Sequence, residues 1–324
     1  MRWFLVVMLA AAIAVAAPAA PVRVAITPPI AEGSGSAEPL RHFADPKTPL
    51  ASLTDDPLLG RSPRVNGEEV KGLVAFTFDD GPNPETTPAV IDALEKYDIP
   101  ATFFIVTQRL AGKHGEVPRQ LLQRELDAKF LVGSHSVTHK NLKKADGDVV
   151  AKEIDASFRT LARDADRAIG LFRPPYGALS GTGRARLKKL GVTEVIWSVD
   201  TLDWKAHDPD KLRKKVLKMI LHDGGGIVLM HDVKPITAKI INDVLDDLEV
   251  ENCRRLAAKE EPIWPVSLHY FLRDDARTSR AIPADVTQRT DAYKVALPTR
   301  CKNRHPVKDD GLPCLANPLA KGCS

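Results

Sequence analysis

The stretch LVAFTFDDGPNPETTPAVIDALEKY, residues 73–97, leads from an apolar run through two adjacent aspartates into a helical pattern. An almost wholly apolar run such as LVAFTF predicts a strand that is buried on both faces. PAVIDALEKY, residues 88–97, has helical periodicity, with Thr87 as a possible N-cap. Asp79 and Asp80 stand between these two elements, where their like charges repel each other. The fold must therefore place something opposite these carboxylates that offsets the repulsion.

Further apolar runs alternate with helical patterns along the chain. We expect strands at residues 73–78, 101–106, 130–134, 171–173, 194–199, 226–230 and 264–268. Apolar strands that alternate with helices are typical of a parallel sheet. The polar residues at the C-terminal ends of different strands are Asp79, Asp80, His135, Arg173, Asp200 and His231. Because the loops at that end of a (β/α) barrel converge on one site, we predict an α/β fold with an imperfect seven-stranded barrel rather than an open sheet.

The composition sets the size and the class of the protein. The chain has 324 residues, of which 44% are hydrophobic, and this is enough for one large domain with extensions. The formal net charge is only +4, and no long basic or acidic run is present. We therefore expect no nucleic-acid partner.

The N-terminus has the pattern of an export signal. Arg2 precedes an apolar run that ends in small residues, which predicts a secretory signal peptide over residues 1–17. An uncleaved anchor is the alternative, but the run from Trp3 to Ala17 is shorter than the ~20 residues that a membrane-spanning helix needs. Residues 18–64 are rich in Pro, Ser, Gly and Ala and predict a flexible linker. We expect an exported protein, periplasmic or in the cell envelope, without a transmembrane span after cleavage.

The chain has four cysteines, which allow three disulfide pairings in an oxidising compartment. They are Cys253, Cys301, Cys314 and Cys323. Three of them fall in the tail that we assign to residues 273–324, and a disulfide that ties this tail down, with Cys253 as one candidate partner, is the favoured interpretation. A zinc knot is the alternative, but no CxxC spacing supports it.

GSHSVTHKNL, residues 133–142, supplies two histidines at i and i+4. On one helical turn, the imidazoles of His135 and His139 would point the same way and could share a metal. Ser136 stands where a zincin protease has glutamate, so that class is not supported. Two histidines and one carboxylate leave coordination positions open, as in catalytic metal sites. The pair alone is ambiguous, because such spacing also occurs on ordinary surface helices.

Five motifs follow one another along the chain: TFDDGP (77–82), HSVTH (135–139), RPPYG (173–177), LDW (202–204) and LMH (229–231). In this order they resemble the motifs of the NodB-type polysaccharide deacetylases, carbohydrate esterase family 4. The resemblance runs from about Gly72 to Leu272, and we assign the deacetylase domain to residues 65–272. It implies a deformed (β/α)7 barrel and the metal-dependent removal of acetyl groups from sugars, most often from N-acetylglucosamine.

The resemblance also implies a role for each motif residue. Asp80, His135 and His139 would bind a divalent metal, with Zn²⁺ expected first and Co²⁺, Ni²⁺ or Mn²⁺ as alternatives. Asp79 would be the general base that takes a proton from a metal-bound water, and the same cation would relieve its repulsion with Asp80. Arg173 would pair with Asp79 and keep it ionised.

The remaining motif residues would complete the site. The backbone N–H of Tyr176 would stabilise the oxyanion, and His231 would be the general acid, supported by Asp203. Trp204 and Leu229 would line a pocket for the acetyl methyl group, although apolar residues in such loops are often only core.

The motifs do not identify the polymer, because the chemistry acts on the acetyl group. We expect peptidoglycan first, chitin or chitooligosaccharide second and O-acetyl xylan third, for a monomeric protein. A non-catalytic glycan-binding protein is the main alternative; a missing base, acid or ligand would favour it, and none is missing. An amide hydrolase for small cyclic amides is a further alternative.

Overall fold

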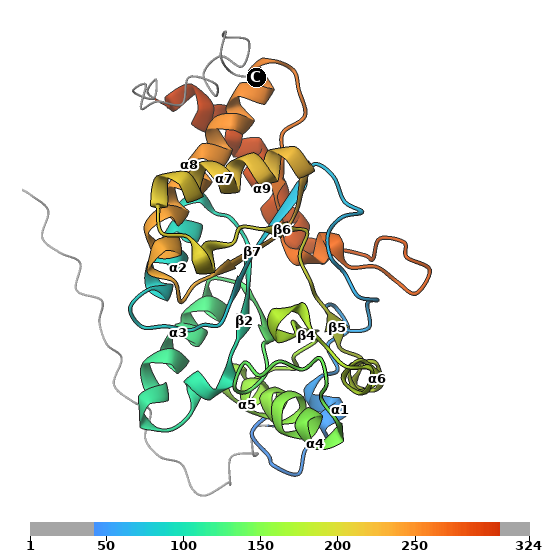
Figure 1. The fold of residues 1–324 in the computed structure, drawn as a ribbon. Helices are drawn as coiled ribbons and strands as arrows, with labels where there is room; N and C mark the ends of the chain where they lie inside the picture. The colour runs from blue at the N-terminus through green and yellow to red at the C-terminus, as the bar shows by residue number, and fades with distance from the viewer. Residues whose placement is uncertain (1–41, 305–324) are drawn as a thin grey trace, which may run out of the picture. The chain divides into compact units, whose positions relative to one another are not determined.

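The computed structural model describes residues 42–304. The predicted signal peptide, most of the predicted linker, Cys314 and Cys323 lie outside these residues. The described strands form one parallel sheet in the order β5-β4-β3-β2-β1-β7-β6, and β8 pairs with β1 away from this path (Figure 1). The predicted α/β class with a deformed (β/α)7 barrel is confirmed.

The centre of the sheet is β1 (Leu73–Asp79), the strand that the apolar run predicts. All of its residues after Leu73 are buried, because the strand has sheet neighbours on both edges and core on both faces. Its neighbours are β2 (Ala101–Ile105) and β7 (Gly225–His231), and β3 (Leu131–Ser134) lies beyond β2. The C-terminal ends of these strands therefore lie at one end of the sheet.

The predicted single strand at 194–199 is wrong, because the structure divides it into two. β5 (Thr193–Glu194) pairs with β4 (Leu171–Phe172), whereas β6 (Val199–Asp200) pairs with β7 at the other edge. Between them, the carbonyls of residues 195 and 196 each accept a hydrogen bond of 3.3 Å from the Arg173 guanidinium. One chain segment thus joins the two edges of the sheet and completes a deformed ring.

Helices follow the strands in the predicted alternation. They are α2 (Thr87–Tyr97), α3 (Glu116–Asp127), α4 (Gly147–Val150), α5 (Ala156–Ala165), α6 (Gly181–Leu190), α7 (Pro209–Asp223) and α8 (Pro235–Ala257). The N-cap of α2 is Thr86, not the predicted Thr87, because the Thr87 hydroxyl donates to the buried Asp232 carboxylate instead. Within residues 42–304, no helix combines the length and the apolar character that crossing a membrane requires.

The second half of the predicted linker belongs to the folded domain. Residues 42–64 include the short helix α1 (Leu50–Leu53), and Leu53 and Thr54 are buried. The Thr54 hydroxyl donates to the carbonyl of Leu190 at 2.9 Å, which ties this segment to α6. The linker prediction is therefore wrong for residues 42–64, because Leu50 and Leu53 pack into the core.

The C-terminal part of the described chain is a helix fastened to the domain. After β8 (Trp264–Pro265), α9 (Ala284–Asn303) packs on α8 (Figure 1). A disulfide joins Cys253 to Cys301. This pairing agrees with the interpretation in which Cys253 holds the tail.

Candidate active site

The strand ends form one pocket of about 370 Å³ at the C-terminal edge of the sheet. Its lining residues are Asp79, Asp80, His135, His139, Tyr176, Trp197, Asp200, Trp204, Leu229, His231 and Lys234. Of the residues that the sequence singles out, only Arg173 and Asp203 lie behind this surface, where they are buried. The structure therefore brings all five motifs to one place.

The two aspartates that end β1 occupy different environments. Asp79 is the last residue of the strand and is 2% exposed. Asp80 has a φ of 79°, so the chain turns immediately after the strand, and one oxygen of each carboxylate lies 3.6 Å from Nε2 of His135. Adjacent carboxylates can nevertheless have different partners.

The turn after Asp80 requires glycine at position 81, because it packs closely against the Asp232 carboxylate. A Cβ at position 81 would lie 2.1 Å from Oδ2 of Asp232, which is closer than any normal contact. Asp232 is fully buried, and this burial raises its pKa to about 7. The turn after Asp80 is thus packed against the loop that follows β7.

The two histidines lie in a loop after β3 and not on a helical turn, so that part of the prediction is wrong. Ser136 and His139 have φ values of 69° and 62°, which a helix does not allow. Hydrogen bonds hold the loop: the Ser136 hydroxyl accepts from the N–H of His139, and the Ser134 hydroxyl accepts from the N–H of Ser136. The imidazoles still come together, with ring centroids 5.0 Å apart.

The donor atoms of Asp80, His135 and His139 fit a metal ion. Asp80 Oδ1 lies 3.6 Å from Nε2 of His135 and 3.3 Å from Nε2 of His139. This oxygen is buried and has no hydrogen-bond partner among the described residues. A buried acceptor without a donor is costly, and a cation shared with two imidazoles would satisfy it.

The protonation of His135 suits this role. Its Nδ1–H donates to the carbonyl of Arg173 at 2.7 Å, which leaves Nε2 with a free lone pair. Burial lowers the pKa of His135 to about 3, so the ring is neutral. These are the properties that a metal-ligating imidazole requires.

Arg173 is the cation opposite Asp79. Its guanidinium is fully buried and donates to Asp79 Oδ1 and to the Thr77 hydroxyl, each at 2.8 Å. Burial raises the pKa of Asp79, and the charge and the hydrogen bond of Arg173 oppose that rise. The guanidinium also lies 4.2 Å from the ring centroid of Phe104, so an aromatic face supports the buried charge.

A second charged pair lies across the pocket. The Nδ1–H of His231 donates to Asp203 Oδ1, and its backbone N–H donates to Oδ2, both at 2.7 Å. The hydroxyl of Thr237 completes the contacts of the Asp203 carboxylate at 2.6 Å. Burial alone would lower the pKa of His231, but the hydrogen bond and charge of Asp203, with smaller effects from Asp79 and Asp80, raise it to about 9.

The mouth of the pocket is aromatic. Tyr176 and Trp204 are 65% and 53% exposed, whereas Leu229 is 4% exposed and forms part of the floor. Tyr176 has a φ of 59°, and its ring lies edge-on to His139 with centroids 4.7 Å apart.

Sequence reasoning missed Trp197 and Lys234, which also line the pocket. Trp197 lies in the stretch that predicted a continuous strand, where an aromatic residue looks like core. Lys234 belongs to none of the five motifs, and no sequence signal marks it.

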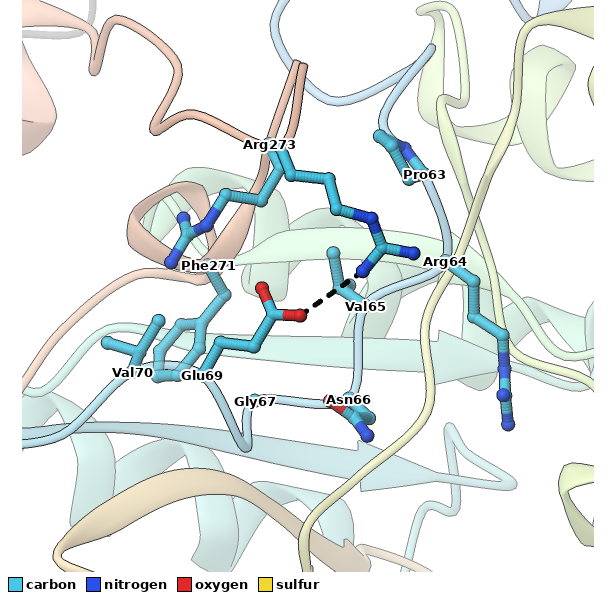
Figure 2. Close-up of a pocket in the computed structure, with 10 residues that line it drawn as sticks. Pro63, Arg64, Val65, Asn66, Gly67, Glu69, Val70, Phe271 and Arg273 are labelled. Atoms are coloured by element: carbon cyan, nitrogen blue, oxygen red, sulfur yellow. Dashed lines mark hydrogen bonds and ion pairs between the residues drawn. The ribbon is translucent and has the colours of Figure 1, made fainter. Parts of the chain in front are cut away.

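A small hollow elsewhere, of about 20 Å³, contains none of the motif residues (Figure 2). It holds an ion pair between Glu69 and Arg277 at 3.2 Å, in which both side chains are exposed to solvent. The candidate site is therefore the pocket at the strand ends.

The chain belongs to the polysaccharide deacetylase family. The family model described as polysaccharide deacetylase matches residues 66–195. A chitooligosaccharide deacetylase of a Bradyrhizobium species is 34% identical over 53% of this chain and 77% of its own length. The peptidoglycan-N-acetylglucosamine deacetylase PgdA of Listeria monocytogenes is 32% identical over 66% of this chain, and the match spans 44% of that relative.

Two solved structures show the same fold. The Bc1960 peptidoglycan N-acetylglucosamine deacetylase has a TM-score of 0.54 at 26% identity, over 68% of this chain and 95% of its own. BA3943 from Bacillus anthracis, described as a carbohydrate esterase family 4 pseudoenzyme, has a TM-score of 0.50 at 25% identity, over 58% of this chain and 64% of its own. The family therefore includes both enzymes and a pseudoenzyme.

Proposed function

We propose that this protein is a metal-dependent deacetylase that hydrolyses N-acetyl groups of N-acetylglucosamine-containing polysaccharide, with peptidoglycan first and chitooligosaccharide second. The observation that carries the proposal is the unpartnered Asp80 Oδ1 between two imidazoles, with the Asp79–Arg173 and His231–Asp203 pairs in the same small space. A binding surface needs no such set of acid, base and metal ligands.

The metal would be held by Asp80, His135 and His139, and zinc suits two imidazoles and a carboxylate best, with cobalt, nickel or manganese as alternatives. When bound, a divalent cation lowers the pKa of water towards ~7 and stabilises negative charge on the acetyl oxygen.

Asp79 would take the proton of the attacking water. Its fixed partner Arg173 holds the carboxylate in place and favours its ionised form, in which it can act as a base. The water oxygen bonds to the acetyl carbon, and the negative charge moves to the acetyl oxygen. The backbone N–H of Tyr176 would donate to that oxygen, because it makes no hydrogen bond with any described residue.

His231 would then protonate the departing amine as the C–N bond breaks, which releases acetate and a free amino sugar. Its raised pKa keeps the imidazole protonated at neutral pH. Leu229 at the floor and Trp204 at the mouth would contact the acetyl methyl group and the sugar.

A non-catalytic glycan-binding role is the second candidate, because a pseudoenzyme is among the structural relatives. The present chain retains a base, an acid and a full ligand set in one pocket, which favours the enzyme. Peptidoglycan lies outside the cytoplasmic membrane, so the preferred substrate also requires the export that residues 1–17 predict.

Acetate release from the purified protein tests the proposal. We expect acetate from N-acetylglucosamine pentamer or from peptidoglycan, lost with EDTA and restored by zinc or cobalt. Bound metal without acetate from either substrate would contradict the proposed reaction and favour the binding role.

A further inference from the structure

The pocket has one cationic side chain that no carboxylate neutralises. Among the described residues that line it, Lys234 is the only lysine or arginine, beside three aspartates. Its ammonium makes no hydrogen bond or ion pair with any residue of 42–304, although the nearby Arg173 and His231 each have a carboxylate partner.

Hydrogen bonds fix the backbone of Lys234, so the fold determines where its side chain begins. Its N–H donates to the carbonyl of His231 at 3.1 Å, and its own carbonyl accepts from Ala238 at 3.1 Å as the N-cap of α8. Only the flexible side chain can move, and it is partly exposed at the pocket.

A second ammonium without a carboxylate partner among the described residues lies against Trp204, a residue that lines the pocket. Lys205 closes the short helical turn Asp203–Lys205, and its Nζ is 5.3 Å from the ring centroid of Trp204 at the pocket mouth. This turn follows β6 and Lys234 follows β7, and these strands pair through Asp200 and Leu229. Neither lysine has a carboxylate partner within the described part of the chain.

An ammonium that is free, positioned and beside a binding pocket suits a carboxylate of the ligand, because lysine is a compact point charge on a flexible stem. The acetyl group itself does not need it, since the site already holds donors for the developing charge. Lys234 lines the pocket and Lys205 lies against Trp204 at its mouth, so both ammonium groups are accessible to a part of the ligand beyond the acetyl group.

We propose that Lys205 and Lys234 bind carboxylates on the sugar next to the one that loses its acetyl group, so the preferred substrate is a carboxylate-bearing acetylated glycan rather than a neutral one. The inference rests on the proposed function and sharpens it. Chitin offers no such group, whereas peptidoglycan offers the lactyl carboxylate or the carboxylates of its stem peptides.

Binding can test this without turnover. The probe is a peptide-bearing tetrasaccharide of peptidoglycan, compared by calorimetry with the same fragment after its carboxyl groups are converted to methylamides. The protein is the full chain with Asp79→Asn, which prevents hydrolysis. Exposed ion pairs are weak, so we expect the charged fragment to bind about threefold to tenfold more tightly than the blocked fragment at low salt. This difference in affinity should fall at 0.5 M salt, because salt screens the charges.

The double substitution Lys205→Gln and Lys234→Gln should remove most of that difference. Lys239→Gln is the matched control, because Lys239 is an exposed lysine further along α8 that does not line the pocket. A fragment stripped of its peptide, with a free lactyl carboxylate, identifies which carboxylate is bound. Equal binding of the charged and blocked fragments, or a preference that survives the double substitution, would overturn the inference.

The outcome is separate from that of the proposed function. Acetate release by the unmodified protein decides the reaction, whereas the binding preference decides the role of the lysines. A preference without acetate would support the anionic ligand and reject the enzyme; acetate without a preference would do the reverse.

Discussion

Asp79 and Asp80 are neighbours in sequence with opposite surroundings. Asp79 has a buried cationic partner in Arg173, and Asp80 has a buried oxygen with none. The charge of Asp79 is thus offset by Arg173, whereas the charge of Asp80 is left for a bound cation to offset. The two carboxylates can do different work for this reason.

Asp79→Asn should abolish turnover while metal stays bound. The amide keeps the size of the side chain but cannot accept the water proton, and loss of a general base costs about 10²–10⁴ in rate. Acetate release and metal content by atomic emission measure the two effects. Residual activity within tenfold of the parent protein would remove Asp79 as the base.

His135→Ala should remove the metal, because it deletes a buried neutral ligand that is oriented by the carbonyl of Arg173. Metal content after dialysis is the measurement, with His114→Ala, an exposed histidine outside the pocket, as the control. Unchanged metal content in His135→Ala would refute this ligand assignment.

Asp203→Asn should shift the alkaline limb of the pH profile to lower pH. Asp203 raises the pKa of His231, which stands at about 9, so its loss moves that pKa towards the ordinary value of 6.5. A general acid works only while protonated, so kcat/KM should begin to fall at lower pH than in the parent protein. An unmoved limb would show that another group donates the proton.

At the scale of single residues, the motifs located the pocket but not all of its lining. The motif side chains lie at the C-terminal ends of strands, and parallel strands bring these ends together independently of the conformation of the loops. Lys234 could not be predicted, because a lysine after a strand has no pattern that separates a pocket cation from a solvated one.

At the scale of elements, the sequence predicted the strands and helices better than the links between them. The stretch 194–199 has the apolar character of one strand, but its middle carbonyls bond to a guanidinium that lies far away in sequence. The helical prediction for the two histidines failed for a related reason. The positive φ values at Ser136 and His139 accompany hydrogen bonds in which serine hydroxyls accept from backbone N–H groups, and spacing alone does not show these bonds.

Gly81→Ala should destabilise the fold and loosen the metal site. The new methyl group would meet the Asp232 carboxylate, and overpacking of this kind typically costs about 1–3 kcal/mol. Thermal unfolding and metal affinity are the measurements. Gly147→Ala is the matched control, because a Cβ there meets nothing within 4 Å; equal melting temperatures for the two variants would contradict the predicted clash.

At the scale of the whole molecule, alternation of apolar runs and helical patterns was enough to predict the sheet. The linker prediction, which rested on a composition rich in Pro, Ser, Gly and Ala, failed for residues 42–64, because such a segment can be irregular and still pack against the core. Leu53 in that segment is 1% exposed. Packing of single leucines against distant helices leaves no local signal.

Replacing Cys253 and Cys301 by serine should lower the free energy of unfolding by about 2–4 kcal/mol, because the disulfide closes a long loop in the unfolded chain. The bond spans 48 residues and joins α8 to α9. Neither cysteine lines the pocket, so acetate release at low temperature should persist. Denaturant unfolding measures the change; a loss of activity in the still-folded variant would mean that α9 supports the pocket.

The tryptophans that line the pocket should make the fluorescence of the protein sensitive to ligand binding. Trp197 and Trp204 both line the pocket, while Trp264 lies in β8 outside it. Indole emission depends on the polarity around the ring, and Trp204 is half exposed beside an ammonium. A glycan that displaces water from this ring changes its fluorescence, so the protein carries its own reporter of occupancy, and ligand titrations need no added label.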